Sequence, residues 1–192
     1  MNANSKPALF NTLENISHII EGCKKQDQLS QEKLYRQFYP ALFALCKTFF
    51  EDKQDILTAL NNGMLRVFKN IEQYDESKGA FFNWVYTIVR NAALTLIRDK
   101  KTNLTFELTE NVKEQIDNNP FKQLEWKDIY YYLDKLPAKT RCVCSLYYLE
   151  GFSMKEISGS IDMKEGAVKW HLSECRSRLK IIFEQHNIKK SG

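Results

Sequence analysis

Apolar residues recur at steps of three and four along most of this chain, which is the spacing of one buried face of an α-helix. Such stripes run over residues 34–49, 56–71 and 81–97, and we expect Pro40 to kink the first helix or to start a new segment. Alternation with a period of two, which predicts strands, is nearly absent, and the chain holds only 7 Gly and 4 Pro. The sequence therefore predicts an all-α fold.

The composition excludes several classes of protein. A length of 192 residues allows one domain or two small ones, and a hydrophobic fraction of 43% is too high for a disordered chain. No apolar run approaches the roughly 20 residues that a membrane span needs, so we expect no direct membrane insertion. The segment Met1–Asn11 is polar and lacks the apolar core of a secretory signal. We therefore expect a cytoplasmic location.

The cysteines and histidines do not form a recognisable metal or redox motif. Cys142-Val-Cys144 lacks the C-x-x-C spacing, and the three histidines are scattered. We interpret the five cysteines as small buried hydrophobes of a cytosolic protein. We also find no Gly-rich phosphate loop and no nucleophile–base pair, so we predict no enzyme activity, no cofactor, no metal and no small-molecule substrate.

The charge distribution divides the chain into three parts. Residues 1–101 have a net charge of +3, residues 102–121 of −3, and residues 122–192 of +4. The middle part has no long helical stripe and ends at Asn118-Asn119-Pro120. We predict two small, basic helical domains joined by a flexible acidic linker.

The strongest local motif is a helix-turn-helix near the C-terminus, after a helix that begins near Pro137 and ends at Gly151. Ser153 and Glu156 have the spacing of a capping box, which predicts a short helix of about two turns. Asp162 and Glu165 repeat that spacing, and we expect them to start a longer helix over roughly residues 164–183. Its predicted buried stripe is Val168, Leu172, Cys175, Leu179 and Ile182.

The other face of that last helix is polar and basic, as in a recognition helix that enters the major groove of DNA. A solvated amphipathic helix is the alternative, but the adjacent capped helices favour DNA binding. We expect phosphate contacts from Arg176 and Arg178. The expected base-edge contacts are Lys164, Glu165, Lys169, Trp170, His171 and Ser173.

A second mixture of aromatic, amide and basic residues covers residues 78–101. This combination suits unpaired nucleic acid, because rings stack on bases and cations contact the backbone. Thr87, Arg90, Asn91 and Arg98 can share one helix face. The alternative is that the aromatic residues form only a core, which we expect for Phe81 among others.

Together these residues resemble the extracytoplasmic-function group of bacterial RNA polymerase sigma factors. The first matching block is Leu34-Tyr-Arg-Gln-Phe-Tyr, Leu65-Arg-Val-Phe, Tyr74-Asp75, Lys78-Gly79, Phe82, Trp84 and Val89-Arg90-Asn91, which looks like region 2. The second is Leu133-x-x-Leu136-Pro137, Arg141, Leu146, Glu150-Gly151-Phe-Ser153, Glu156-Ile157, Glu165-Gly166-Ala-Val168-Lys169 and Arg176-x-Arg178-Leu179, which looks like region 4. The resemblance covers about residues 29–101 and 122–184.

The resemblance implies a transcription initiation factor that binds RNA polymerase core through its largest and second-largest subunits. Region 2 would melt the minus-ten element and hold flipped-out bases, and region 4 would read the minus-thirty-five element as duplex. An anti-sigma factor is a further implied partner. The implied minus-ten residues are Tyr74, Lys78, Phe82, Asn83, Trp84, Thr87, Arg90, Asn91, Arg98 and Lys101.

The chain departs from the family in the stretch expected to bind the polymerase clamp. Between Asp55 and Phe68 only Asp55 is acidic, so we expect altered polymerase contacts, through Asp55, Asn61, Asn62 and Arg66. Thr95 stands where the family commonly has Asp, Asp162 replaces a turn Gly, and Lys164 replaces a Ser cap. His171, Ser173 and Glu174 replace more basic residues, which predicts a changed promoter sequence.

Two other functions remain compatible with the sequence. One is a helix-turn-helix regulator that binds duplex DNA without polymerase, although the aromatic and basic block disfavours it. The other is a sigma-like adaptor that binds polymerase poorly, which the missing acidic residues permit.

Overall fold

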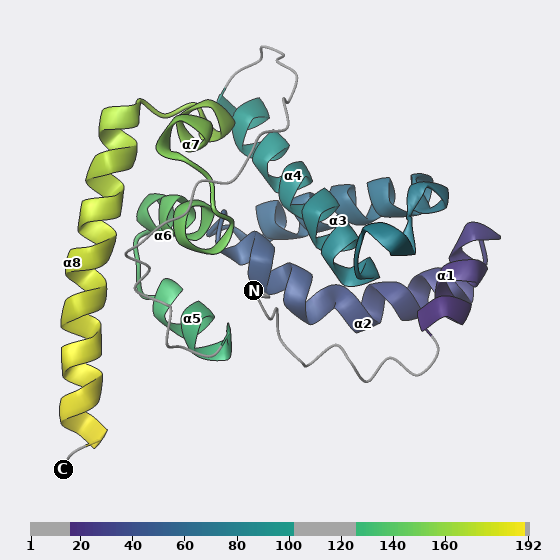
Figure 1. Ribbon diagram of the computed structural model, residues 1–192, viewed down its shortest axis with the longest axis horizontal. Coiled ribbons are helices and arrows are strands. Elements are labelled where there is room, and N and C mark those ends of the chain that lie inside the picture. The colour runs from purple at the N-terminus through teal and green to yellow at the C-terminus, as the bar shows by residue number, and fades with distance from the viewer. Residues whose placement is uncertain (1–15, 102–125, 191–192) are drawn as a thin grey trace. The chain divides into compact units, whose positions relative to one another are not determined.

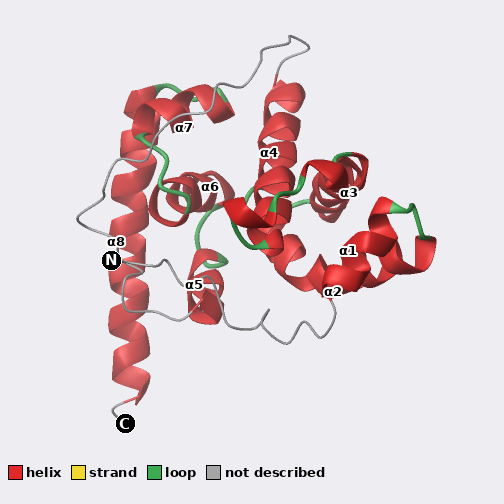
Figure 2. Ribbon diagram, turned by 45° about the vertical axis from the view of Figure 1, so that its right-hand side comes forward, coloured by secondary structure: helices red, strands yellow, loops and turns green. Residues whose placement is uncertain are grey.

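A computed structural model describes residues 16–101 and 126–190, and the predicted acidic linker lies outside these residues. All regular structure in the described ranges is helical (Figures 1 and 2). The α-helices are α1 (Ile16–Lys24), α2 (Gln28–Lys47), α3 (Lys53–Lys69), α4 (Phe81–Lys101), α5 (Trp126–Leu133), α6 (Ala138–Cys144), α7 (Met154–Ile161) and α8 (Glu165–Lys190). Two short 3₁₀ helices, η2 (Ile71–Gln73) and η3 (Glu76–Lys78), and one π-helical turn, η4 (Ser145–Leu149), complete the structure.

The chain forms two compact units, Met1–Ala93 and Leu94–Gly192, and we describe each by itself. In unit 1, α2 packs against both α1 and α3. The predicted stripes form its core: Leu34, Phe38, Leu42, Leu45, Leu60, Met64, Val85 and Val89 are buried. Pro40 lies inside the continuous helix α2, so no new segment starts there.

Local capping explains where α2 and α3 begin. The carboxylate of Asp27 accepts the backbone N–H of Ser30 at 2.8 Å, at the start of α2. Asp52 accepts the N–H groups of Gln54 and Asp55 at 2.7 and 3.2 Å, at the start of α3. These bonds satisfy N–H groups that have no acceptor inside the helix.

The second unit is organised around α8, with α5, α6 and α7 along one side of it (Figure 1). Its core contains the predicted stripe of α8, because Val168, Leu172, Cys175 and Leu179 are buried, and Ile157 and Ile161 of α7 pack there too. Ile182 is only half-buried. The helix that was expected from Pro137 to Gly151 is present, but its last turn widens into the π-helical turn η4.

The helix-turn-helix is present as α7 and α8, and one of its two predicted caps is confirmed. Ser153 and Glu156 form the capping box, with bonds of 2.8 and 3.2 Å between each side chain and the other's backbone N–H. The role predicted for Asp162 as the N-cap of α8 is wrong, whereas its expected place in the turn, as a replacement for Gly, is confirmed. Asp162 ends α7 in the left-handed conformation, with φ of 49°, and the carbonyl of Lys164 accepts the first backbone bonds of α8. Asp reaches this conformation more readily than most residues.

All five cysteines are buried, as the sequence predicts, but two of them are also paired. Cys144 of α6 and Cys175 of α8 form a disulfide across a Cα–Cα distance of 6.4 Å, which the sequence interpretation missed. The other three are free, and burial raises the pKa of Cys46 to about 12. The pairing arises from the packing of α6 on α8, which joins residues 31 positions apart.

Candidate nucleic-acid interfaces

A cluster of three aromatic rings lies at the start of α4 in unit 1. Tyr74 meets Phe81 edge-on with ring centroids 4.8 Å apart, and Trp84 stacks on Phe81 at 5.7 Å. Phe81 is buried, whereas Tyr74 and Trp84 are half-exposed. The cluster therefore has one buried ring, Phe81, and two partly exposed rings that can offer a face to a planar ligand.

The loop before α4 is closed by its own side chains. The Tyr74 hydroxyl donates to the Gly79 carbonyl at 3.0 Å, and Asp75 caps η3 by accepting the N–H and hydroxyl of Ser77 at 2.9 and 2.6 Å. These two Ser77 bonds hold the pKa of Asp75 below its ordinary value, with a smaller effect from Lys78. Gly79 has φ of 140°, a conformation that favours glycine. These hydrogen bonds hold the loop in a defined conformation next to the aromatic rings.

The structure separates the remaining minus-ten candidates by exposure. Asn83 and Thr87 are exposed on successive turns of α4, and the Thr87 hydroxyl donates to the Asn83 carbonyl at 2.9 Å. Lys78 is exposed as well. Phe82 is only 9% exposed and packs edge-on against Phe38 at 5.2 Å, so it lies in the core rather than on the surface.

The basic candidates farther along α4 are engaged by neighbours on the same helix. Arg90 donates to the side-chain carbonyl of Asn91, through Nε at 3.4 Å and Nη2 at 3.3 Å, and both residues are half-buried. Arg98 donates to the Thr95 hydroxyl at 3.5 Å. The side chain of Lys101 lies outside the described residues.

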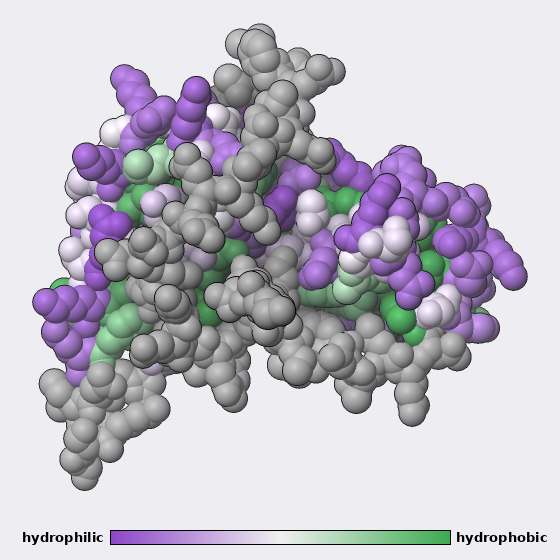
Figure 3. All heavy atoms as spheres, in the orientation of Figure 1, coloured by the Kyte–Doolittle hydropathy of each residue, from purple (hydrophilic) through white to green (hydrophobic). Residues whose placement is uncertain are grey.

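In the second unit, α8 presents most of the predicted DNA-contacting side chains to solvent. Trp170 is 59% exposed, and hydrophilic residues gather along α8 (Figure 3). The other exposed candidates are Lys164, Glu165, Lys169, Ser173, Arg176 and Arg178. Arg178 pairs with Glu174 one turn earlier, and Arg176 Nη1 donates to the Tyr148 hydroxyl at 3.1 Å.

His171 is the exception among the α8 candidates. Its ring is half-buried and shares a hydrogen bond of 3.0 Å between Nδ1 and the hydroxyl of the buried Thr140 on α6. Desolvation lowers its pKa, and nearby Lys139 lowers it further. The Trp170 ring lies edge-on to His171 at 4.8 Å. His171 is therefore held between α6 and Trp170, where it can support the exposed indole.

The polymerase candidates lie on α3. Asp55 is half-exposed, whereas Asn61, Asn62 and Arg66 are exposed, and the Asn61 side chain accepts the Tyr35 hydroxyl of α2 at 2.8 Å. Leu65 is 52% exposed between them, a large apolar side chain that the sequence interpretation did not single out as part of this surface.

The part of the chain that the structure describes contains neither a candidate metal site nor a candidate membrane span. In residues 16–101 and 126–190, no group of three or more His, Cys, Asp or Glu side chains could hold a metal ion. None of the described helices is long and apolar enough to cross a membrane.

Comparison with known proteins matches both units to one family. A family model described as Sigma-70 region 2 matches residues 34–102, and one described as Sigma-70, region 4 matches residues 126–179. The ECF RNA polymerase sigma factor SigM of Bacillus subtilis (strain 168) is 26% identical over 157 residues, which cover 80% of this chain and 95% of that protein.

Two further similar proteins extend this comparison. SigE of Mycolicibacterium smegmatis (strain ATCC 700084 / mc(2)155), also named an ECF RNA polymerase sigma factor, is 24% identical over 168 residues, 82% of this chain and 63% of that protein. A solved structure of CnrH in complex with the cytosolic domain of CnrY covers 88% of this chain and 96% of that chain, with 16% identity and a TM-score of 0.44.

Proposed function

Because the chain belongs to the extracytoplasmic-function group of RNA polymerase sigma factors, we propose that its two helical units divide promoter recognition between them. As a sigma factor it is no enzyme: it binds RNA polymerase core and promoter DNA and directs the initiation of transcription. In the proposed division, residues 1–101 melt and read the minus-ten element and bind the polymerase clamp. Residues 122–192 read the minus-thirty-five element, and residues 102–121 link them.

The ring cluster is the observation that carries the minus-ten part of the proposal. Tyr74 and Trp84 are half-exposed and pack on the buried ring of Phe81. The adjacent loop is ordered by the hydrogen bond between Asp75 and Ser77. Stacking on such rings is worth about 1–3 kcal/mol per base, which is comparable with the few kcal/mol that unstacking a base costs. The residues that would contact the strand around it are Lys78, Asn83, Thr87, Arg90, Asn91, Arg98 and Lys101. Phe82 has no such contact in this proposal, because it packs in the core against Phe38.

The exposed face of α8 supports the duplex-reading part of the proposal. Lys169 and Arg176 are seven residues apart, so they lie on nearly the same side of the helix. We assign Arg176 and Arg178 to phosphates, and Lys164, Glu165, Lys169, Trp170 and Ser173 to base edges. His171 has a supporting place in this arrangement because Thr140 holds its ring.

The partners and location follow from the same proposal. We assign core binding to the exposed face of α3, where Leu65 adds apolar area to Asp55, Asn61, Asn62 and Arg66. An anti-sigma factor that holds the chain inactive is the regulatory partner we expect from the family. Because polymerase and DNA are cytoplasmic in bacteria, we place the chain there.

A charge substitution on α8 tests the duplex-reading assignment. Replacing Lys169 with alanine removes one cation from the proposed interface, and Lys135→Ala is the matched control, since its ammonium group lies 4.5 Å over the Tyr131 ring outside the helix-turn-helix. We expect Lys169→Ala to weaken duplex binding and to lower the slope of log affinity against log salt by about 1. An unchanged affinity and slope would remove α8 from the interface.

A further inference from the structure

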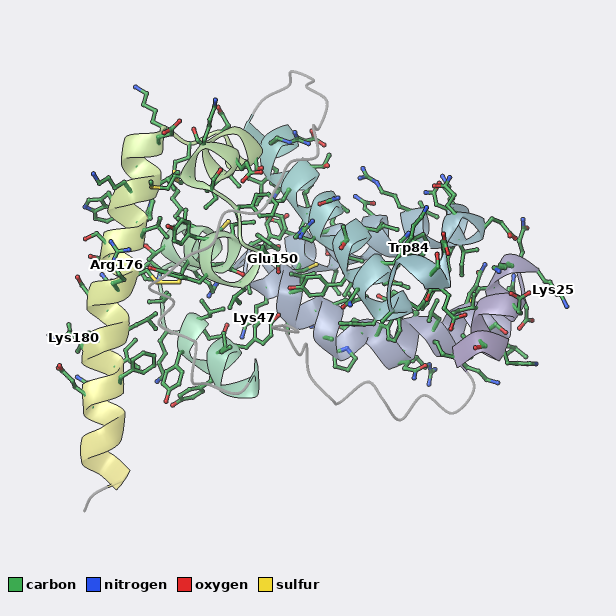
Figure 4. All side chains as sticks on the ribbon, viewed as in Figure 1. Lys25, Lys47, Trp84, Glu150, Arg176 and Lys180 are labelled. Atoms are coloured by element: carbon green, nitrogen blue, oxygen red, sulfur yellow. A yellow bond between two sulfur atoms is a disulfide. The ribbon has the colours of Figure 1, made fainter. Side chains whose placement is uncertain are left out.

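Arg176 occupies a special place on α8, at the border between its exposed face and its buried stripe. It directly follows the buried Cys175, whose sulfur is bonded to Cys144 of α6 (Figure 4). Its side chain therefore starts next to the interface that α8 makes with α6 and η4. Lys169, seven residues earlier, lies on the same side of the helix.

The guanidinium of Arg176 is held by a buried tyrosine from another segment. Arg176 Nη1 donates to the Tyr148 hydroxyl at 3.1 Å, across 28 positions of sequence. Tyr148 is only 6% exposed, and its ring meets that of Tyr147 edge-on at 5.0 Å. The phenol oxygen is consequently a fixed acceptor rather than a mobile surface group.

The backbone around Tyr148 is irregular. Residues Ser145–Leu149 form a π-helical turn, in which the N–H of Glu150 bonds to the carbonyl of Ser145 at 3.1 Å. A π-helical turn holds one more residue than an α-helical turn and so changes the direction in which its side chains point; such turns are frequent at functional sites. Here the turn buries Tyr148 with its hydroxyl at Arg176.

We propose that Tyr148 is a positioning residue for DNA, which fixes the Arg176 guanidinium so that it can bind a backbone phosphate. This proposal rests on the proposed function of α8. A guanidinium has five N–H donors, so one bond to Tyr148 leaves others in the same plane for the paired bonds that arginine makes to phosphate. Because the side chain is already ordered, less conformational entropy is lost when DNA binds.

Arg178 shows what Tyr148 adds. Arg178 pairs with the carboxylate of Glu174, so a phosphate must compete with a negative charge for it. Tyr148 is a neutral acceptor, and it orders Arg176 without cancelling its charge. Of the two arginines, Arg176 is therefore the one prepared for a phosphate.

A double-mutant cycle on the full chain tests the proposal. The variants are Tyr148→Phe, Arg176→Ala and the double variant, with Tyr147→Phe as the matched control that removes a hydroxyl from the neighbouring tyrosine. A labelled duplex of random sequence is titrated with each variant at several salt concentrations, and fluorescence anisotropy gives the affinity.

We expect Tyr148→Phe to weaken duplex binding about threefold to tenfold, the range that corresponds to ordering one long side chain. The salt slope should stay unchanged because the charge remains, whereas Arg176→Ala should lower the slope by about 1. Adding Tyr148→Phe to Arg176→Ala should cause no further loss, and Tyr147→Phe should bind as the unmodified chain does.

Each other outcome overturns the positioning role. If Tyr148→Phe binds DNA normally, or weakens binding equally with and without Arg176, the hydroxyl does not act through the guanidinium. Thermal unfolding of each variant identifies a purely structural effect, which would appear in the Arg176→Ala background too. If Arg176→Ala itself leaves affinity and slope unchanged, the assignment of Arg176 to phosphate fails along with this proposal; the Lys169→Ala test of α8 remains separate.

Discussion

Gly63 of α3 lies directly against Val89 of α4, and this contact allows a quantitative prediction. A Cβ atom added at Gly63 would lie 2.7 Å from the Cα atom and 2.8 Å from the Cγ2 atom of Val89. A backbone atom cannot rotate away, so α3 and α4 would have to separate. Replacing Gly63 with alanine is therefore the perturbation.

Two opposing effects determine the expected size of the change. Overpacking a core costs about 1–3 kcal/mol, whereas alanine is favoured over glycine inside a helix by about 1 kcal/mol. Gly159 of α7 is the matched control, because it is exposed and nothing lies within 4 Å of an added Cβ. Gly159→Ala should stabilise unit 2 by about 0.5–1 kcal/mol. The helix preference cancels between the two variants, so Gly63→Ala should be less favourable by about 1–3 kcal/mol.

Hydrogen exchange measured peptide by peptide can separate the two units, because it reports the free energy of opening for each segment. Peptides from α3 and α4 should exchange faster in Gly63→Ala, and peptides from α7 and α8 should exchange more slowly in Gly159→Ala. Equal stabilisation by both substitutions would refute the close approach of α3 and α4.

Three further predictions concern the ring cluster, the loop and the cysteines. Trp84→Ala should weaken binding of single-stranded minus-ten DNA to the polymerase complex by roughly 5- to 100-fold, the value of one stacked base, and anisotropy that shows no loss would contradict the assignment. The bonds from Ser77 lower the pKa of Asp75 below its ordinary value of 3.8. Above pH 3.8 the carboxylate is therefore ionised and the Ser77 bonds hold the loop. These bonds are lost as the pH falls through the lower pKa of the folded protein. The Ser77 amide signal should therefore titrate with a midpoint below 3.8, and a midpoint at or above 3.8 would argue against the cap. After mild oxidation, thiol counting in denaturant should find three free cysteines, and mass spectrometry should link Cys144 to Cys175; five free thiols or another pair would count against this disulfide.

Structural features that depend on residues close together in the sequence, such as helix faces and capping boxes, were predictable. The stripe that contains Leu34 and Phe38 is buried as expected, because helical periodicity places these side chains on one face whatever they pack against. The capping box of Ser153 and Glu156 is also local, since both bonds join residues three apart. Helical periodicity and this one capping box were therefore the most accessible part of the fold.

Features that depend on packing between helices were not predictable. Tyr148 and Arg176, or Thr140 and His171, are 28 and 31 positions apart, and no spacing rule connects them. Asp162 was assigned to the wrong helix, because Asp suits both an N-cap and a left-handed C-cap. In each case the tertiary arrangement of α6, α7 and α8 determines which contact or cap forms, and the sequence alone does not distinguish the alternatives.

The same distinction applies to the candidate interfaces. Phe82 belongs to an aromatic run that suits nucleic acid, and only its contact with Phe38 across the core shows that it is buried. Leu65, in contrast, looks like a core residue by type but is exposed on α3. Residue type suggested which segments form the candidate interfaces, and packing determined which side chains of those segments are exposed.

Mapping of transcription start sites with purified polymerase core and a promoter library tests the central claim most directly. We predict a set of starts that appears only when this chain is added, shares sequence elements near minus ten and minus thirty-five, and disappears with Trp84→Ala. Duplex binding by the chain alone, with no start that depends on it, would contradict the account and identify a DNA-binding regulator that acts without polymerase.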